Sequence, residues 1–366
     1  MTTTTAPTAR TGVTAFETVR IWGLHLLCFV LPLTSFLFLA TAPHPWYAAL
    51  PWLLVIIVSI VADVRSGSER REPAATMPGW PFDGVIYALA ALQLLNVILL
   101  VRMVALHGFI ATDTLVGWLL VGINSGYSGI VVAHELIHRS EHHRQQLGRL
   151  LLGSVLYEHF ATEHIRGHHA RVATADDPAT ARFGESGVAF LMRTVPAQLE
   201  SAWRLESRRL GDERLRWSDP RMLRHRVLHG LVLEWGVALA VLAILGAGPF
   251  VIYLLQALLA VRLLEAVNYF EHWGLARAGR RVTSIDSWDT DSWFTLYTLV
   301  GLSRHADHHA HASRPFQQLR LREESPKLPY GYFGTVALVL FRNARFRTLA
   351  TKELARRRLG PFAAAA

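Results

Sequence analysis

The chain has 366 residues, of which 51% are hydrophobic and only 18% charged, whereas soluble domains carry about 25% charged residues, so the composition favours a membrane protein. Its single cysteine, Cys28, excludes an intramolecular disulfide and a cysteine metal site. The formal charge of +9 comes almost wholly from arginine, and these arginines flank apolar segments, which indicates membrane topology rather than nucleic-acid binding.

Six apolar runs are long enough to cross a bilayer. We expect these spans at residues 21–40, 46–62, 85–104, 115–132, 228–245 and 251–267. The threonine-rich residues 1–20 are predicted to be disordered or to lie on the surface. Near the other end, residues 330–341 are apolar but too short to span, which predicts an interfacial helix.

The distribution of arginine predicts the orientation of these spans. Six spans place both termini on one side, together with the polar segments that hold most of the arginines, whereas the opposite loops 41–45, 105–111 and 246–248 contain no Lys or Arg. The positive-inside rule therefore places both termini in the cytoplasm. The expected fold is an all-α integral membrane protein with one domain, residues 1–366. Six transmembrane helices carry a cytoplasmic histidine-rich cap, formed by residues 133–226 and 268–366.

Four short motifs hold most of the histidines that fit a metal site. They read HELIH at 134–138, EHIRGHH at 163–169, NYFEHWGL at 268–275 and RHADHHAH at 304–311. Histidines three or four residues apart lie on one helical face, and neutral imidazole suits zinc, copper, iron or nickel. Nine nitrogens exceed what one ion takes, so two ions are indicated. The predicted ligands are His134, His138, His164, His168, His169, His272, His305, His308 and His309.

Four carboxylates lie beside predicted ligands, and we expect them to hold an imidazole through its second nitrogen. They are Glu135, Glu163, Glu271 and Asp307. A carboxylate-rich di-metal bundle would need two Glu-x-x-His pairs, and only Glu135 with His138 is found, so the site is histidine-dominated. Three histidines, His142, His143 and His159, fit no motif, and the role of His311 stays open.

Two metal ions with open positions, at the inner end of an apolar bundle, suggest oxygen chemistry on an apolar substrate. The aromatic residues Trp46, Trp52, Trp118 and Tyr127 could gate the length of that substrate. Trp46 and Trp52 are also typical of residues that anchor a span at the membrane interface.

Two other classes compete with this interpretation. HELIH also fits the HExxH motif of zinc proteases, with Glu135 as the general base. A protease needs only one further ligand and leaves most of the histidines unexplained. A metal carrier would scatter ligands through the spans, which hold almost none.

The four motifs, with the second continuing to Pro178, resemble the AlkB-type integral-membrane alkane 1-monooxygenases of the membrane fatty-acid desaturase/hydroxylase superfamily. The resemblance is close over residues 133–182 and 266–318. It implies that the nine histidines bind two non-haem iron ions and that O2 and a hydrocarbon react to give a 1-alkanol. It also implies rubredoxin as electron donor, reduced by an NAD(P)H-dependent reductase, and a place in the bacterial inner membrane.

The resemblance leaves the substrate open. Xylene- and cymene-type hydroxylases of aromatic methyl groups share these motifs, and fatty-acyl desaturases and hydroxylases are near relatives. The arginine-rich segment 204–226 could dock the acidic rubredoxin or contact lipid headgroups.

Overall fold

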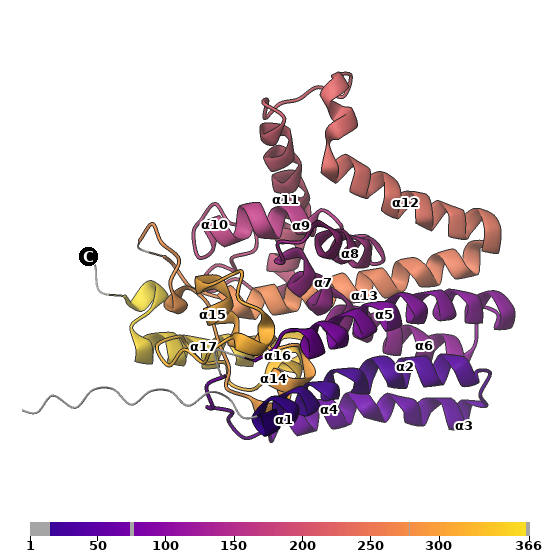
Figure 1. Ribbon diagram of the computed structural model, residues 1–366, viewed down its shortest axis with the longest axis horizontal. Helices are drawn as coiled ribbons and strands as arrows, with labels where there is room; N and C mark the ends of the chain where they lie inside the picture. The colour runs from indigo at the N-terminus through magenta and orange to yellow at the C-terminus, as the bar shows by residue number, and fades with distance from the viewer. Residues whose placement is uncertain (1–14, 74–76, 278, 364–366) are drawn as a thin grey trace, which may run out of the picture.

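Six membrane-spanning helices dominate the computed structural model, which describes residues 15–73, 77–277 and 279–363 (Figure 1). Every predicted span is confirmed, and each is longer than its apolar run. The reason is that helical hydrogen bonding does not stop where the apolar residues stop. The spans are Phe16–Thr41, Trp46–Val64, Trp80–His107, Thr112–Ile137, Arg226–Leu245 and Ala247–His272.

The first two spans each contain a short 3-10 turn near a proline. The first consists of α1 (Ala15–His25), η1 (Leu26–Phe29) and α2 (Val30–Thr41), and the second of α3 (Trp46–Ala49), η2 (Leu50–Leu53) and α4 (Leu54–Val64). Proline lacks an N–H and clashes with the carbonyl four residues earlier, so the backbone tightens locally around Pro32 and Pro51. Because α1 begins at Ala15, residues 15–20 are helical rather than disordered, and residues 1–14 lie outside the described part.

Three of the other four spans share a buried polar network. These four spans are α5 (Trp80–His107), the composite of α6 (Thr112–Asn124), the π-helical turn η3 (Ser125–Gly129) and α7 (Ile130–Ile137), then α12 (Arg226–Leu245) and α13 (Ala247–His272). Asn124 donates to Gln93 at 2.7 Å, Gln93 to Ser125 at 2.8 Å, and Ser125 to Gln256 at 2.9 Å. This connected network links α5, α6 and α13 to one another inside the membrane. In Figure 1, α12 diverges from the bundle and meets α13 at a tight turn.

The remaining elements form a cap at one end of the bundle (Figure 1). Between α7 and α12 lie α8 (His142–Gly153), α9 (Phe160–Glu163), the π-helical turn η4 (His164–His168), α10 (His169–Arg171), α11 (Gly187–Arg209) and η5 (Pro220–Arg224). After α13 come η6 (Ser284–Asp286), α14 (Trp293–Thr298), η7 (Leu302–Arg304), α15 (His305–Ala310), η8 (Phe316–Gln318), α16 (Tyr332–Phe341), α17 (Asn343–Arg357) and η9 (Gly360–Phe362). The described residues form no sheet, only two isolated bridges.

The helix α16 is not the interfacial helix that its sequence predicted. It packs against α4 and α13, and all but a few of its residues are buried. The physical reason is that apolar residues occupy all sides of this short helix, so it is covered by protein instead of lying half in water.

Candidate metal centre

The nine predicted ligands converge on two adjoining groups inside the cap, where they are buried or half-buried. The first group contains His134 from α7, His138 just after it, His164 and His169 from the η4 region, and His308 from α15. The second joins two overlapping sets that share His272 at the end of α13: His168 from η4 with His309 from α15, and His305 from α15 with Glu271 from α13. Helices far apart in sequence thus deliver imidazoles to one place.

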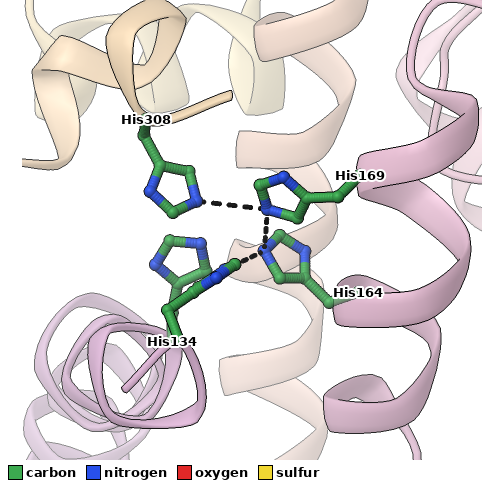
Figure 2. Close-up of side chains that lie close together, drawn as sticks. His134, His164, His169 and His308 are labelled. Carbon is green, nitrogen blue, oxygen red and sulfur yellow. Dashed lines mark hydrogen bonds between the residues drawn. The ribbon is translucent and has the colours of Figure 1, made fainter. Parts of the chain in front are cut away.

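In the first group the ring Nε2 atoms face one another. His164 Nε2 lies 3.0 Å from that of His138 and 3.1 Å from that of His169, and His169 lies 3.2 Å from His308. Figure 2 shows the rings of His134, His164, His169 and His308 turned toward a common centre. The Nε2 of His134 is buried and has no hydrogen-bond partner among the described residues.

The second group is a similar chain of ring nitrogens. His309 Nε2 lies 3.3 Å from His168 and 3.0 Å from His305, and His305 lies 3.3 Å from His272. An oxygen of Glu271 lies 3.3 Å from His305 Nε2, so one carboxylate belongs to this group as well.

This arrangement fits a bound metal ion better than it fits hydrogen bonds between imidazoles. A ring nitrogen offers one hydrogen or one lone pair, so His164 and His309 cannot each satisfy two neighbours. Metal–nitrogen bonds of about 2.1 Å would separate neighbouring ligands by about 2.9 to about 3.4 Å, which matches the observed 3.0–3.3 Å. The residues therefore suit one ion in each group.

The surroundings keep these imidazoles neutral, as ligation requires. Burial, reinforced by the neighbouring histidines, holds the pKa values of His164, His169 and His308 well below 6.5. The same causes lower the pKa values of His305 and His309.

The π-helical turn η4 decides which histidine joins which group. The sequence places His168 and His169 about one α-helical turn after His164. Instead, the His169 N–H bonds to the His164 carbonyl, five residues back, and this wider turn brings His169 beside His164. His168 then points to the second group. The spacing of these histidines in a regular α-helix does not predict that His168 and His169 join different groups.

The helix α15 divides its histidines in the same way. Successive residues of an α-helix point about 100° apart, so adjacent His308 and His309 project to different sides. His308 joins the first group, whereas His305 and His309, four residues apart, join the second.

Three of the four predicted carboxylates contact arginines instead of a predicted ligand. Glu135 forms an ion pair with Arg139 at 2.6 Å, and Glu163 accepts from Arg171 at 2.7 Å. Asp307 is bonded by Arg314, by Arg322 and by the Arg320 N–H. Among the described residues, none of these three carboxylates bonds to the second ring nitrogen of a predicted ligand, because nearby arginines attract the carboxylates more strongly. The pairs fix the ligand-bearing helices, and burial raises the pKa of Glu163 to about 7.

Glu271 contacts the Nε2 atom of His305, and the carboxylate that contacts the second nitrogen, Nδ1, of a predicted ligand was not among the predicted residues. Asp177 is buried and accepts from His168 Nδ1 at 2.9 Å and from the Thr180 hydroxyl at 2.6 Å. Although burial opposes its charge, the contact with His168 holds the pKa of Asp177 below its usual value. Its only sequence signal is its place in the continuation of the second motif, nine residues after His168.

An apolar cavity adjoins both groups. His134, His164 and His305 form its polar end, and Tyr127, Val131 and Leu263 belong to its apolar wall. Tyr127 lies on the π-helical turn η3 and stacks on Phe333 with ring centroids 4.5 Å apart. It also lines a second apolar cavity between Cys28 and Phe294. Of the four aromatic residues considered as gates, Tyr127 lines the cavity beside the histidine groups, and Trp46, Trp52 and Trp118 do not.

The remaining histidines of the cap lie outside both groups. His142 lies on α8 beside a polar cavity that contains none of the nine. His159 is buried against Tyr157, with ring centroids 4.4 Å apart. His311 lies 3.2 Å from Asp307 and is partly exposed.

Comparison with known proteins agrees with this architecture. A family model described as fatty acid desaturase matches residues 112–336. The chain is 36% identical to alkane 1-monooxygenase 2 of Pseudomonas aeruginosa over 82% of each chain, and 42% identical to alkane 1-monooxygenase 1 of the same organism over 61% of this chain and 60% of the relative. A more distant similarity, 22% identity over 56% of this chain and 55% of the relative, links it to the xylene/toluene monooxygenase hydroxylase component XylM of Pseudomonas putida.

Proposed function

The chain belongs to the fatty acid desaturase family and, within it, to the alkane 1-monooxygenases, and on that premise we propose that it hydroxylates the terminal C–H bond of an alkane to give a 1-alkanol. The single observation that carries the proposal is the apolar cavity whose polar end is made of His134, His164 and His305. The cavity has a free volume of about 30 Å³, so it would admit the end of a substrate without polar groups against the histidines, and the rest of the chain would need the apolar wall to move.

We propose that each group holds one non-haem iron ion. The first supplies five imidazoles, and the second supplies four imidazoles with Glu271 alongside. Iron accepts imidazole ligands, and a pair of bound irons would supply the O2-dependent oxidation of an unactivated C–H bond. Overall, the alkane, O2, two electrons and two protons give the alcohol and water.

The chain's own residues position the substrate and exclude water. Tyr127, Val131 and Leu263 favour an apolar chain over water along the cavity wall. The stacked pair of Tyr127 and Phe333 limits how deep that chain can reach. Asp177 keeps the proton of His168 on Nδ1, so that Nε2 is free to bind metal.

The electrons come from rubredoxin, which an NAD(P)H-dependent reductase keeps reduced. The histidine groups lie in the cap, and the positive-inside rule places the cap in the cytoplasm, where such a donor is found. We accordingly propose the inner membrane of a bacterium as the location, with both termini cytoplasmic.

A zinc protease fits this geometry poorly. The general base of an HExxH protease must be free to take a proton from water. Glu135 Oε1 instead forms an ion pair with Arg139 at 2.6 Å and accepts from the Phe316 N–H at 3.2 Å.

The test is product analysis with membranes that contain the protein. Rubredoxin, reductase and NADH are added with alkanes of graded length, with p-xylene as the aromatic competitor and an acyl chain as the desaturase substrate. We expect 1-alkanols and about two irons per chain. An alkene from the acyl chain, faster oxidation of p-xylene, or one zinc per chain would each overturn the proposal.

A further inference from the structure

An aromatic path connects the second histidine group to the surface of the cap. Trp273 follows His272 directly and is only 1% exposed. Its ring centroid lies 5.2 Å from that of Phe183, which is 46% exposed. Phe183 in turn lies 5.9 Å from Phe362, which is 39% exposed. Two phenyl rings on the surface are thus joined by ring contacts and a peptide bond to a predicted ligand.

Backbone contacts hold this path rigidly. The Trp273 indole N–H donates to the Glu185 carbonyl at 3.0 Å, and the Trp288 indole N–H donates to the Trp273 carbonyl at 2.9 Å. Gly274 has φ +71°, and a Cβ there would lie 3.2 Å from the Phe183 ring. Only glycine fits both that backbone conformation and that close approach.

The surface around Phe183 is basic. Arg182 is exposed, and the Arg347 guanidinium donates to the Gly184 carbonyl at 2.9 Å. The nearby Glu185 is occupied by Arg193 at 2.8 Å. Exposed aromatic rings among arginines are typical of a site that binds an acidic protein surface.

The arginine-rich segment 204–226 is a weaker candidate for binding an acidic protein surface, because neighbouring carboxylates neutralise much of its positive charge. Arg204 pairs with Glu200 at 2.5 Å, Arg208 with Glu213 at 3.0 Å, Arg209 with Glu206 at 2.7 Å and Arg221 with Asp219 at 2.8 Å.

We propose that Phe183, Phe362 and Arg182 form the surface at which a small acidic one-electron carrier protein docks, and that its electron reaches the metal centre through Trp273 and His272. The inference rests on the proposed function. The C-terminal end of the described chain lies at the end of the molecule opposite the outer tips of the spans (Figure 1), which favours a soluble partner over lipid headgroups. Each docking event oxidises the carrier by one electron, and two such events reduce the centre for one turnover with O2 and two protons.

Two variants test the two parts of the proposal. Arg182→Glu should raise the KM for the carrier roughly tenfold and weaken its dependence on ionic strength, because a charge at the rim of an interface acts mainly on association. Phe183→Leu keeps an apolar side chain but removes the ring, so kcat with the carrier should fall several-fold. When the centre is instead reduced without O2 by dithionite and methyl viologen, which need no docking, and is mixed with O2 and alkane for a single turnover after the reductant has been removed, both variants should match the wild type.

Matched controls are Arg214→Glu and Trp217→Leu in the rival segment, where both residues are exposed. These variants should keep the wild-type KM and kcat. The proposal is overturned if the controls carry the KM effect instead, or if the Phe183 and Arg182 variants lose equal activity with both reductants. Failure of the proposed function would look different, because the wild type itself would then form no alcohol with either reductant.

Discussion

Replacing Asp177 by Asn isolates the effect of one carboxylate on the metal centre. Asn has nearly the same size, and its single oxygen can still accept from the Ala179 N–H, a contact of 3.2 Å to Oδ1 in the native protein, which places its NH2 where Oδ2 meets both His168 and the Thr180 hydroxyl. Its amide would then present an N–H to His168 Nδ1. The imidazole can accept that hydrogen bond only by carrying its own proton on Nε2, the nitrogen that faces His309.

The expected loss follows from this change of tautomer. Residues that orient metal-binding histidines typically contribute 10- to 100-fold in metal affinity or activity, or about 1.4–2.7 kcal/mol. Because His168 belongs to the second group, Asp177→Asn should reduce the iron content from about two toward one per chain. The first group, which lacks this contact, should keep its ion.

The assay is iron content per chain and the rate of iron release to a chelator, measured on the purified protein in lipid nanodiscs. The control is Asp176→Asn, which makes the same chemical change at the neighbouring exposed position. An unchanged iron content and release rate in Asp177→Asn, or an equal loss in Asp176→Asn, would refute the reasoning.

The remaining predictions concern the ligands, the ions and the cavity. His272→Ala should abolish hydroxylation and lower the iron content, whereas His142→Ala should change neither, and an active His272→Ala enzyme would remove the third motif from the site. Removing iron by chelation should lower the unfolding temperature by about 5 °C or more, since an ion present at a hundredfold its Kd stabilises the folded state by about 2.7 kcal/mol; an unshifted thermal scan would contradict this. Tyr127→Ala should join two apolar cavities and shift the product profile toward longer alkanols, and an unchanged profile would exclude Tyr127 as a gate.

The sequence predicts the features that depend on long apolar runs and on repeated motifs. The spans follow from hydropathy because a bilayer demands an apolar stretch of fixed length. The proximity of His134, His272 and His305 follows from topology. His134 and His272 lie at the ends of two spans on the same side of the membrane, and His305 lies in the polar segment on that side. The role of these residues as ligands remains a prediction.

Other features depend on local backbone geometry that no residue pattern encodes. Whether His164 pairs with His168 or with His169 depends on one π-helical turn, and both spacings fit a helix. Which carboxylate reaches an imidazole depends on competing cations: Glu163 lies beside a ligand in sequence but is taken by Arg171, whereas Asp177 is free to contact His168. Adjacency along the chain was therefore a poor guide to contact in space.

The division of adjacent histidines means that the two proposed ion sites are mechanically coupled. A rotation of α15 that moves His308 moves His309 as well, and η4 joins His168 to His169 in the same way. Neither site can be widened or tilted alone through these elements. Independent adjustment is left to His134 and His138 for the first ion and to His272 for the second. Substitutions that change the ligand geometry of one proposed iron without changing that of the other should therefore be found around α7 and the end of α13.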